Sequence, residues 1–208
     1  MYTRLRPIVN KIVFNRRNST FKNKLLSLKA ERKEIGIVPK ILDEQDVIEI
    51  TNFLQKEDDN NDFYLGLFKN RINPGVDTTS KIKATFLHDI CSNNKTSNYL
   101  DIPTSIKLLG TMQGGYNIQP LIQLLENEDF GALAAEQLKK LILVFDYYYD
   151  IEKLHKKGNV HATNVIKSWA NAEWFFSKPE VSEKITLCVL KVPGETNTDD
   201  LSPAVDAW

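Results

Sequence analysis

Apolar residues recur at helical spacing along most of the chain, over about residues 25–177. Asp43 can cap the first helix of this region, whose apolar positions include Val47, Ile50 and Leu54. Shorter helices are predicted around four further apolar groups: Phe63, Leu67 and Phe68; Ile82, Phe86, Leu87 and Ile90, which follow a possible cap at Asp77; Ile106, Leu108 and Leu109; and Leu121, Leu124 and Leu125. Turn residues separate these groups, so the pattern indicates antiparallel helix pairs joined by short loops.

The longest helix is predicted after Asn127, which can cap it. Its apolar stripe consists of Ala134, Leu138, Leu141, Phe145 and Tyr148. A final helix stops at Pro179 and carries Val165, Ile166, Trp169 and Phe176. Helix pairs of this kind are typical of a helical bundle or an α-solenoid. No strict repeat period is present, so any solenoid is degenerate.

The pattern changes at Ser182. Over residues 185–192 the side chains alternate between two faces that are both largely apolar, which predicts a strand buried on both sides. Such a strand needs neighbouring strands and covering layers, and the sequence offers only one strong strand here. The predicted fold class is therefore mainly α, followed by the start of an incomplete α/β domain, and we expect the chain to be the front part of a longer protein.

Charge is distributed unevenly, although 27 Lys and Arg balance 27 Asp and Glu. Residues 1–30 contain no acidic residue, and their basic residues are Arg4, Arg6, Lys11, Arg16, Arg17, Lys22, Lys24 and Lys29. This composition is that of an organelle transit peptide, but it also fits a nucleic-acid-binding arm or an unstructured extension. We expect residues 1–24 to be disordered, because they combine unbalanced charge with no sustained apolar stripe.

The positions of cysteine and histidine exclude several kinds of metal and disulfide site. Cys91 and Cys188 lie far apart, which excludes a disulfide framework and an iron–sulfur cluster held by this chain alone. The three histidines have no pairing at metal-ligand spacing, and Gly114 with Gly115 lacks the spacing of a phosphate-binding loop. The sequence has no run of about 18 apolar residues, so it predicts no transmembrane helix and no membrane partner.

Four stretches carry a resemblance to a known family. They are residues 36–40 (Gly-Ile-Val-Pro-Lys), 70–77 (Asn-Arg-Ile-Asn-Pro-Gly-Val-Asp), 108–117 (Leu-Leu-Gly-Thr-Met-Gln-Gly-Gly-Tyr-Asn) and 191–204 (Lys-Val-Pro-Gly-Glu-Thr-Asn-Thr-Asp-Asp-Leu-Ser-Pro-Ala). Residues 168–175 (Ser-Trp-Ala-Asn-Ala-Glu-Trp-Phe) also fit. Together, over about residues 28–208, they resemble the aconitase B family of aconitate hydratases.

The resemblance implies an enzyme that interconverts citrate and isocitrate through cis-aconitate by means of a [4Fe–4S] cluster, and in many members also hydrates 2-methyl-cis-aconitate. It implies a HEAT-like helical domain at residues 25–179 and the first strand and loop of a swivelling α/β domain at residues 180–208. The family's cluster cysteines and a substrate-binding arginine follow the position of Trp208. The resemblance therefore assigns no cluster ligand to this chain.

One loop in the resembled region, residues 197–202, is expected to face the active-site cleft. Asn197, Thr198 and Ser202 can offer neutral donors to a tricarboxylate substrate. Asp199 and Asp200 would repel such a substrate, so we expect them to brace the loop or to pair with an arginine. Turn formation and strand-end capping are the alternative roles of all five residues.

Two functions remain open from the sequence. The first is the N-terminal segment of an aconitate hydratase, which lacks the cluster and the catalytic groups when alone. The second is a stand-alone HEAT-like binding module for protein or RNA. The resembled family suggests a homodimer through the helical domain, with RNA or metabolic enzymes as further partners. Cytoplasmic localisation is expected, with the mitochondrial matrix as the alternative if residues 1–24 are a cleaved transit peptide.

Overall fold

A computed structural model describes residues 5–56, 60–113, 115–141, 144–177, 180–188 and 194, with the backbone alone for residues 5–19 and Phe145. Within these ranges the regular structure is entirely helical. This agrees with the mainly α fold predicted from the sequence. The elements are α1 (Leu5–Glu34), α2 (Glu44–Leu54), α3 (Asn61–Asn70), α4 (Thr78–Cys91), α5 (Ile102–Leu109), α6 (Ile118–Leu124), α7 (Gly131–Leu138), η1 (Phe145–Tyr147), α8 (Tyr148–Lys156), α9 (Val160–Ala170) and α10 (Glu173–Phe176).

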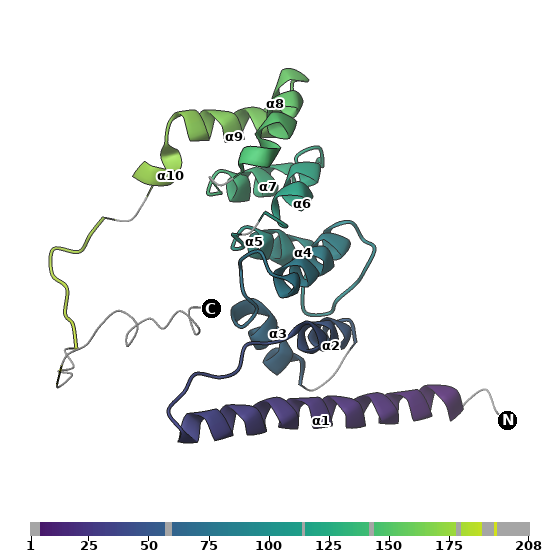
Figure 1. Cartoon of the computed structure of the whole chain (residues 1–208). Helices are drawn as coiled ribbons and strands as arrows, with labels where there is room; N and C mark the ends of the chain where they lie inside the picture. The colour runs from purple at the N-terminus through teal and green to yellow at the C-terminus, as the bar shows by residue number, and fades with distance from the viewer. Residues whose placement is uncertain are drawn as a thin grey trace.

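The helices pack as successive pairs that stack in chain order (Figure 1). Each of α2, α4, α6 and α8 contacts the next helix in the sequence, and the pairs touch one another through α2 with α4, α5 with α7 and α7 with α9. Helix α1 lies across the α2–α3 end of the stack (Figure 1). Contacts of this kind, between neighbours in sequence, are those of an array of helix pairs.

Side-chain caps set the starts of several helices. Asp43 accepts from the backbone N–H of Asp46 and begins α2 in a capping box, and Asp77 accepts from the N–H of Ser80 and begins α4. Both caps confirm the sequence prediction. Asp101 and Asn159 start α5 and α9 in the same way.

The core runs through the stack without interruption. It contains most residues of the predicted stripes, whereas Tyr148 and Phe176 of those stripes are exposed. At the α2–α3 end the rings of Phe53 and Tyr64 stack with centroids 4.8 Å apart. The buried Phe68 meets Phe86 of α4 edge-on at 5.6 Å. Aromatic pairs therefore join the first helix pair to the second.

The N-terminal segment differs from the expectation. Residues 1–24 are predicted to be disordered, whereas α1 extends without a break from Leu5 to Glu34. Residues 8–35 contain neither Gly nor Pro, so nothing in them interrupts a helix. Phe21 anchors α1 on the core, with its ring 5.7 Å from Phe53 and 5.9 Å from Tyr64. A domain boundary at residue 24 would therefore fall inside a helix.

The long helix predicted after Asn127 is wrong. The Asn127 side chain accepts from the N–H groups of Asp129 and Phe130 and forms a turn, and α7 begins only at Gly131. At the other end, Leu141 donates its backbone N–H to the carbonyl of Leu138, a tightened turn that ends the helix. η1 and α8 then carry the rest of the predicted stripe.

The last predicted helix is also two helices. Ala172 adopts a left-handed backbone conformation, with φ 53°, between α9 and α10. Beyond α10, the described residues 180–188 form neither helix nor strand, and Val181, Ile185 and Leu187 are exposed. The predicted strand over residues 185–192 is therefore absent from its described part, residues 185–188, and its remainder lies outside the described residues.

Candidate functional site

The loop between α1 and α2, residues 35–42, is tied to the helices on both sides. Arg71, just after α3, donates from Nη2 to the carbonyl oxygens of Pro39 and Lys40, each at 3.1 Å. Arg32 of α1 donates from Nε to the carbonyl oxygen of Val38. These charged donors hold the backbone of an otherwise irregular loop in one place.

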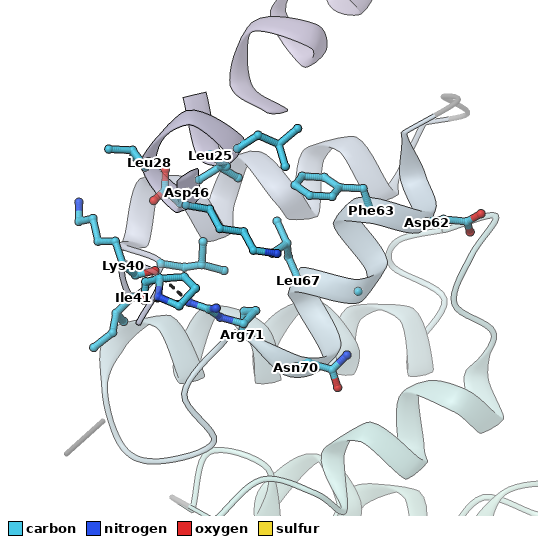
Figure 2. A pocket seen from close by; sticks show the side chains of 15 residues that line it. Leu25, Leu28, Lys40, Ile41, Asp46, Asp62, Phe63, Leu67, Asn70 and Arg71 are labelled. Carbon is cyan, nitrogen blue, oxygen red and sulfur yellow. Dashed lines mark hydrogen bonds between the residues drawn. The ribbon is translucent and has the colours of Figure 1, made fainter. Parts of the chain in front are cut away.

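A cavity of about 420 Å³ lies between this loop, α1 and α3 (Figure 2). Leu25 and Leu28 of α1 lie on one side of it, and Phe63 and Leu67 of α3 line another (Figure 2). Lys40, Ile41 and Arg71 lie together at one end (Figure 2). The walls are mainly apolar, and the charged side chains among them include the buried Asp46.

A second hollow of about 390 Å³ adjoins the first. Pro39, Ile41, Asn70 and Arg71 line both, so the two form one groove that continues to the turn at Asn73 and Pro74. We call it the Arg71 groove, and define it by these shared residues together with the linings of the two hollows. Its two sides come from sequence segments about thirty residues apart that Arg71 joins.

Cations outnumber carboxylates in the lining of the first cavity. Lys29, Lys40 and Arg71 line it together with Asp46 and Asp62. Lys24, which lies outside the lining, is 3.4 Å from the Asp46 carboxylate. Lys40 is likewise 3.5 Å from Asp43, which also lies outside the lining. The two pairs offset one charge of each sign, and Lys29 and Arg71 remain against Asp62, so the groove favours anionic groups.

The turn at residues 73–77 is tied in turn to the loop between α5 and α6. Gln113 donates its backbone N–H to the carbonyl oxygen of Pro74 at 2.7 Å, and the Tyr116 hydroxyl donates to that of Val76 at 3.1 Å. Tyr116 thus links the loop before α6 to the turn before α4. Stretches 36–40, 70–77 and 108–117 consequently follow one another along one edge of the stack, and three of the four stretches that carry the family resemblance meet there.

A buried lysine lies behind this edge and was not predicted. Lys83 of α4 is almost fully buried, and its Nζ donates to the carbonyl oxygen of Lys69 at the end of α3, at 3.3 Å. Nζ also lies 5.4 Å from the centre of the Phe68 ring. Burial lowers the pKa of Lys83 to about 8. Its position on the inner face of a helix is the only sequence signal for this burial.

The predicted substrate-binding loop lies outside the described residues. This holds for the predicted donors Asn197, Thr198 and Ser202 and for Asp199 and Asp200, which are predicted to brace the loop. The proposal that they face a substrate cleft stays a prediction.

Groups suited to bind a metal do not converge in the described part of the chain. No set of three or more His, Cys, Asp or Glu side chains comes together there. Cys91 is buried, which raises the pKa of its thiol to about 11, and Cys188 is exposed. The two cysteines do not make the thiolate set that a [4Fe–4S] cluster takes. Among the described helices, none combines the length and apolarity needed to cross a bilayer.

Comparison with known proteins identifies the family. The family model described as the aconitate B N-terminal domain matches residues 25–175. The chain is 48% identical over 179 residues to aconitate hydratase B of Pseudomonas aeruginosa, 47% identical over 180 residues to that of Escherichia coli, and 42% identical over 181 residues to that of Synechocystis.

Each match covers 86% of this chain and 21% of the relative. The chain therefore spans about a fifth of the length of the curated relatives it matches. The matched region of the family model contains α2 to α9, the Arg71 groove and the edge formed by the three stretches. The chain belongs to the family of the aconitate B N-terminal domain.

Proposed function

We propose that this chain supplies the N-terminal helical part of an aconitate hydratase, a lyase that interconverts citrate and isocitrate through cis-aconitate in the tricarboxylic acid cycle. The observation that carries the proposal is the 48% identity to aconitate hydratase B across 86% of the chain. Hydration of 2-methyl-cis-aconitate is a second reaction of the same proposed enzyme. The chain alone is inactive in this proposal, because two cysteines do not provide a cluster.

The proposed division of labour follows the family. Residues 25–179 form a HEAT-like domain, and residues 180–208 begin a swivelling α/β domain. Asn197, Thr198 and Ser202 contribute donors to the tricarboxylate, and Asp199 and Asp200 brace their loop. The [4Fe–4S] cluster is held by polypeptide beyond this chain. The basic residues 1–24 are a transit peptide if the enzyme works in the mitochondrial matrix; otherwise the enzyme is cytoplasmic and residues 5–24 remain part of α1.

The helical array also suits a binding role. Arrays of helix pairs present extended surfaces to other macromolecules, so a homodimer through the helical domain, RNA and other metabolic enzymes are the proposed partners. A binding module without catalysis is the alternative function. The family match to enzymes favours the first proposal.

A fusion enzyme tests the catalytic proposal. The matched N-terminal stretch of the Pseudomonas aeruginosa relative is replaced by this entire chain, and citrate turnover is measured after anaerobic cluster reconstitution. We expect turnover within about tenfold of the relative, and none from this chain alone. The control is the relative without its N-terminal stretch. A fusion that binds the cluster but has no more activity than this control would contradict the proposal.

A further inference from the structure

The Arg71 groove combines an exposed apolar surface with a fixed backbone. Ile37, Val38, Ile41 and Val76 are exposed on the two loops that border it, and Val38 has 63% of its surface exposed. Loops are usually polar where they face water, and clustered apolar side chains at a hollow mark a surface that another body covers. The hydrogen bonds from Arg71 and Arg32 hold this surface in place before anything binds, which lowers the entropic cost of association.

Arg71 keeps hydrogen-bond donors available to an anionic group in the groove. Its Nη2 donates to the loop carbonyls, and its Nε and Nη1 have no acceptor among the described residues. Lys40 lies 3.5 Å from Asp43 at the surface, an exposed pair that exchanges readily with other partners. A guanidinium with free donors in a half-buried apolar setting suits a carboxylate. The occupant therefore has apolar side chains flanked by Asp or Glu.

The direction of the chain indicates where that occupant comes from. Residues 180–188 run back from α10 along the stack, toward the end at which α2 and α3 lie (Figure 1). Relatives are about five times as long as the matched stretch, so most of their polypeptide follows this point. A second copy suits the groove less well, because a twofold interface centred on it would set Lys29, Lys40 and Arg71 against their own copies.

We propose that the Arg71 groove is the docking surface for the polypeptide that follows the helical domain in this family, which inserts apolar side chains beside Val38 and Ile41 and pairs a carboxylate with Arg71. The inference rests on the proposed function and adds to it a specific contact within one chain. The groove thereby fixes the helical stack against the catalytic part of the enzyme.

Hydrogen exchange of the fusion enzyme tests the contact. Exchange of the peptide covering residues 36–42 is compared between the isolated chain and the fusion, and we expect it to be at least about tenfold slower in the fusion. The peptide around Gly158 and Val160, which spans the start of α9, is the internal control and should exchange equally in both. Equal exchange of residues 36–42 in the two proteins would overturn the proposal. If the fusion does not fold, the same comparison is made for the chain alone and mixed with the relative that lacks its N-terminal stretch, and the same outcomes apply.

A matched pair of substitutions makes the test specific. Val38→Asp places a carboxylate in the groove, whereas Val160→Asp does so at a site of similar exposure, 63% against 66%. Both should leave the melting temperature of the isolated chain unchanged. In the fusion, Val38→Asp should abolish the protection of residues 36–42 and Val160→Asp should preserve it. Protection that survives Val38→Asp together with Ile41→Asp would rule out the groove as the contact.

Zero-length cross-linking identifies the occupant. A carbodiimide joins Lys40 to a touching carboxylate, and mass spectrometry of a mixture of ¹⁴N and ¹⁵N fusion enzyme shows whether both ends belong to one molecule. We expect same-isotope links from Lys40 to residues of the relative's part. Mixed-isotope links would assign the groove to a second copy and overturn the proposal. Citrate turnover is read separately, so an active fusion with an unprotected groove refutes the docking proposal and leaves the proposed function standing.

Discussion

Two apolar segments of the molecule are similarly exposed but held very differently. Val38, in the loop before α2, and Ile185, in the segment after α10, each have 63% of their surface exposed. The first segment receives side-chain hydrogen bonds from Arg32 and Arg71, whereas none is described for residues 180–188. The exposed fraction of the side chains therefore does not distinguish an ordered apolar surface from an unsupported one. The hydrogen bonds to the backbone do.

Proteolysis should show the largest difference between the two segments. Trypsin is expected to cleave after Lys184 on the order of 100-fold faster than after Lys40. Cleavage requires local opening of the backbone, and only the backbone at Lys40 is held by an arginine hydrogen bond. A time course read by mass spectrometry gives both rates from one digestion. Comparable rates would mean that residues 180–188 are supported as well as the loop.

The pH dependence of stability tests whether the buried amine of Lys83 is shielded from water. Its pKa is about 8 when folded against 10.5 when exposed, so below pH 8 the folded protein carries the full cost of a buried charge. Between pH 8 and 10.5 the unfolded chain binds more protons, and stability rises with pH. Lys83→Met should remove this rise and stabilise the protein at pH 7 by about 2–3 kcal/mol.

Urea unfolding of both proteins from pH 7 to 10.5 measures this effect. The thiol of Cys91, with its pKa raised to about 11, acts in the opposite direction above pH 9, but it does so in both proteins. The difference between the two stability curves therefore isolates Lys83. Parallel curves would indicate that water reaches this amine.

Removing the arginine should make the first segment resemble the second. Arg71→Met deletes both hydrogen bonds to the loop, and we expect a loss of about 1–2 kcal/mol in unfolding free energy. Cleavage after Lys40 should become about tenfold faster. Lys107→Met, on the exposed face of α5, is the matched loss of a cation and should change neither quantity. If both variants behave alike, the loop does not depend on Arg71.

The smallest effect is expected in the unsupported segment. Leu187→Ser should change the unfolding free energy by less than about 0.5 kcal/mol, because Leu187 is exposed and has little apolar contact to lose. Leu121→Ser, in the fully buried core of α6, is the control and should cost several-fold more. A large loss from Leu187→Ser would reveal a packing partner for the segment.

The sequence predicts the start of the stack better than its later part. Where a cap and an apolar stripe agree, as for Asp43 with Val47 and Ile50, the helix forms as expected. Asn127 is ambiguous, because its side chain bonds the backbone in a turn as readily as at a helix start. The end of α7 depends on distant groups as well, since the Trp169 indole donates to the carbonyl of Leu138.

The spacing of apolar residues in the sequence does not predict the Arg71 groove. Arg71 stands in a stretch that carries the family resemblance, but its bonds to Pro39 and Lys40 span more than thirty residues and depend on how α1 and α3 come together. Lys83 is similar, because a lysine on a helix is ordinarily solvated and only packing reveals its burial. Local pattern determines the elements, and tertiary packing determines which polar groups meet.

The aspartate caps give the two halves of the stack different responses to acid. Asp43, Asp77 and Asp101 cap α2, α4 and α5. Burial by itself would raise the pKa of Asp77, but hydrogen bonds from the first turns of the three helices hold the pKa values of all three carboxyls below the usual 3.8. The stability they contribute is complete above that value and is lost as the pH falls through their lowered pKa values. Helix α9 begins with Asn159, whose amide does not titrate. Strong acid should therefore first loosen the starts of α2, α4 and α5, in the half of the stack that carries the groove, and leave the start of α9 capped.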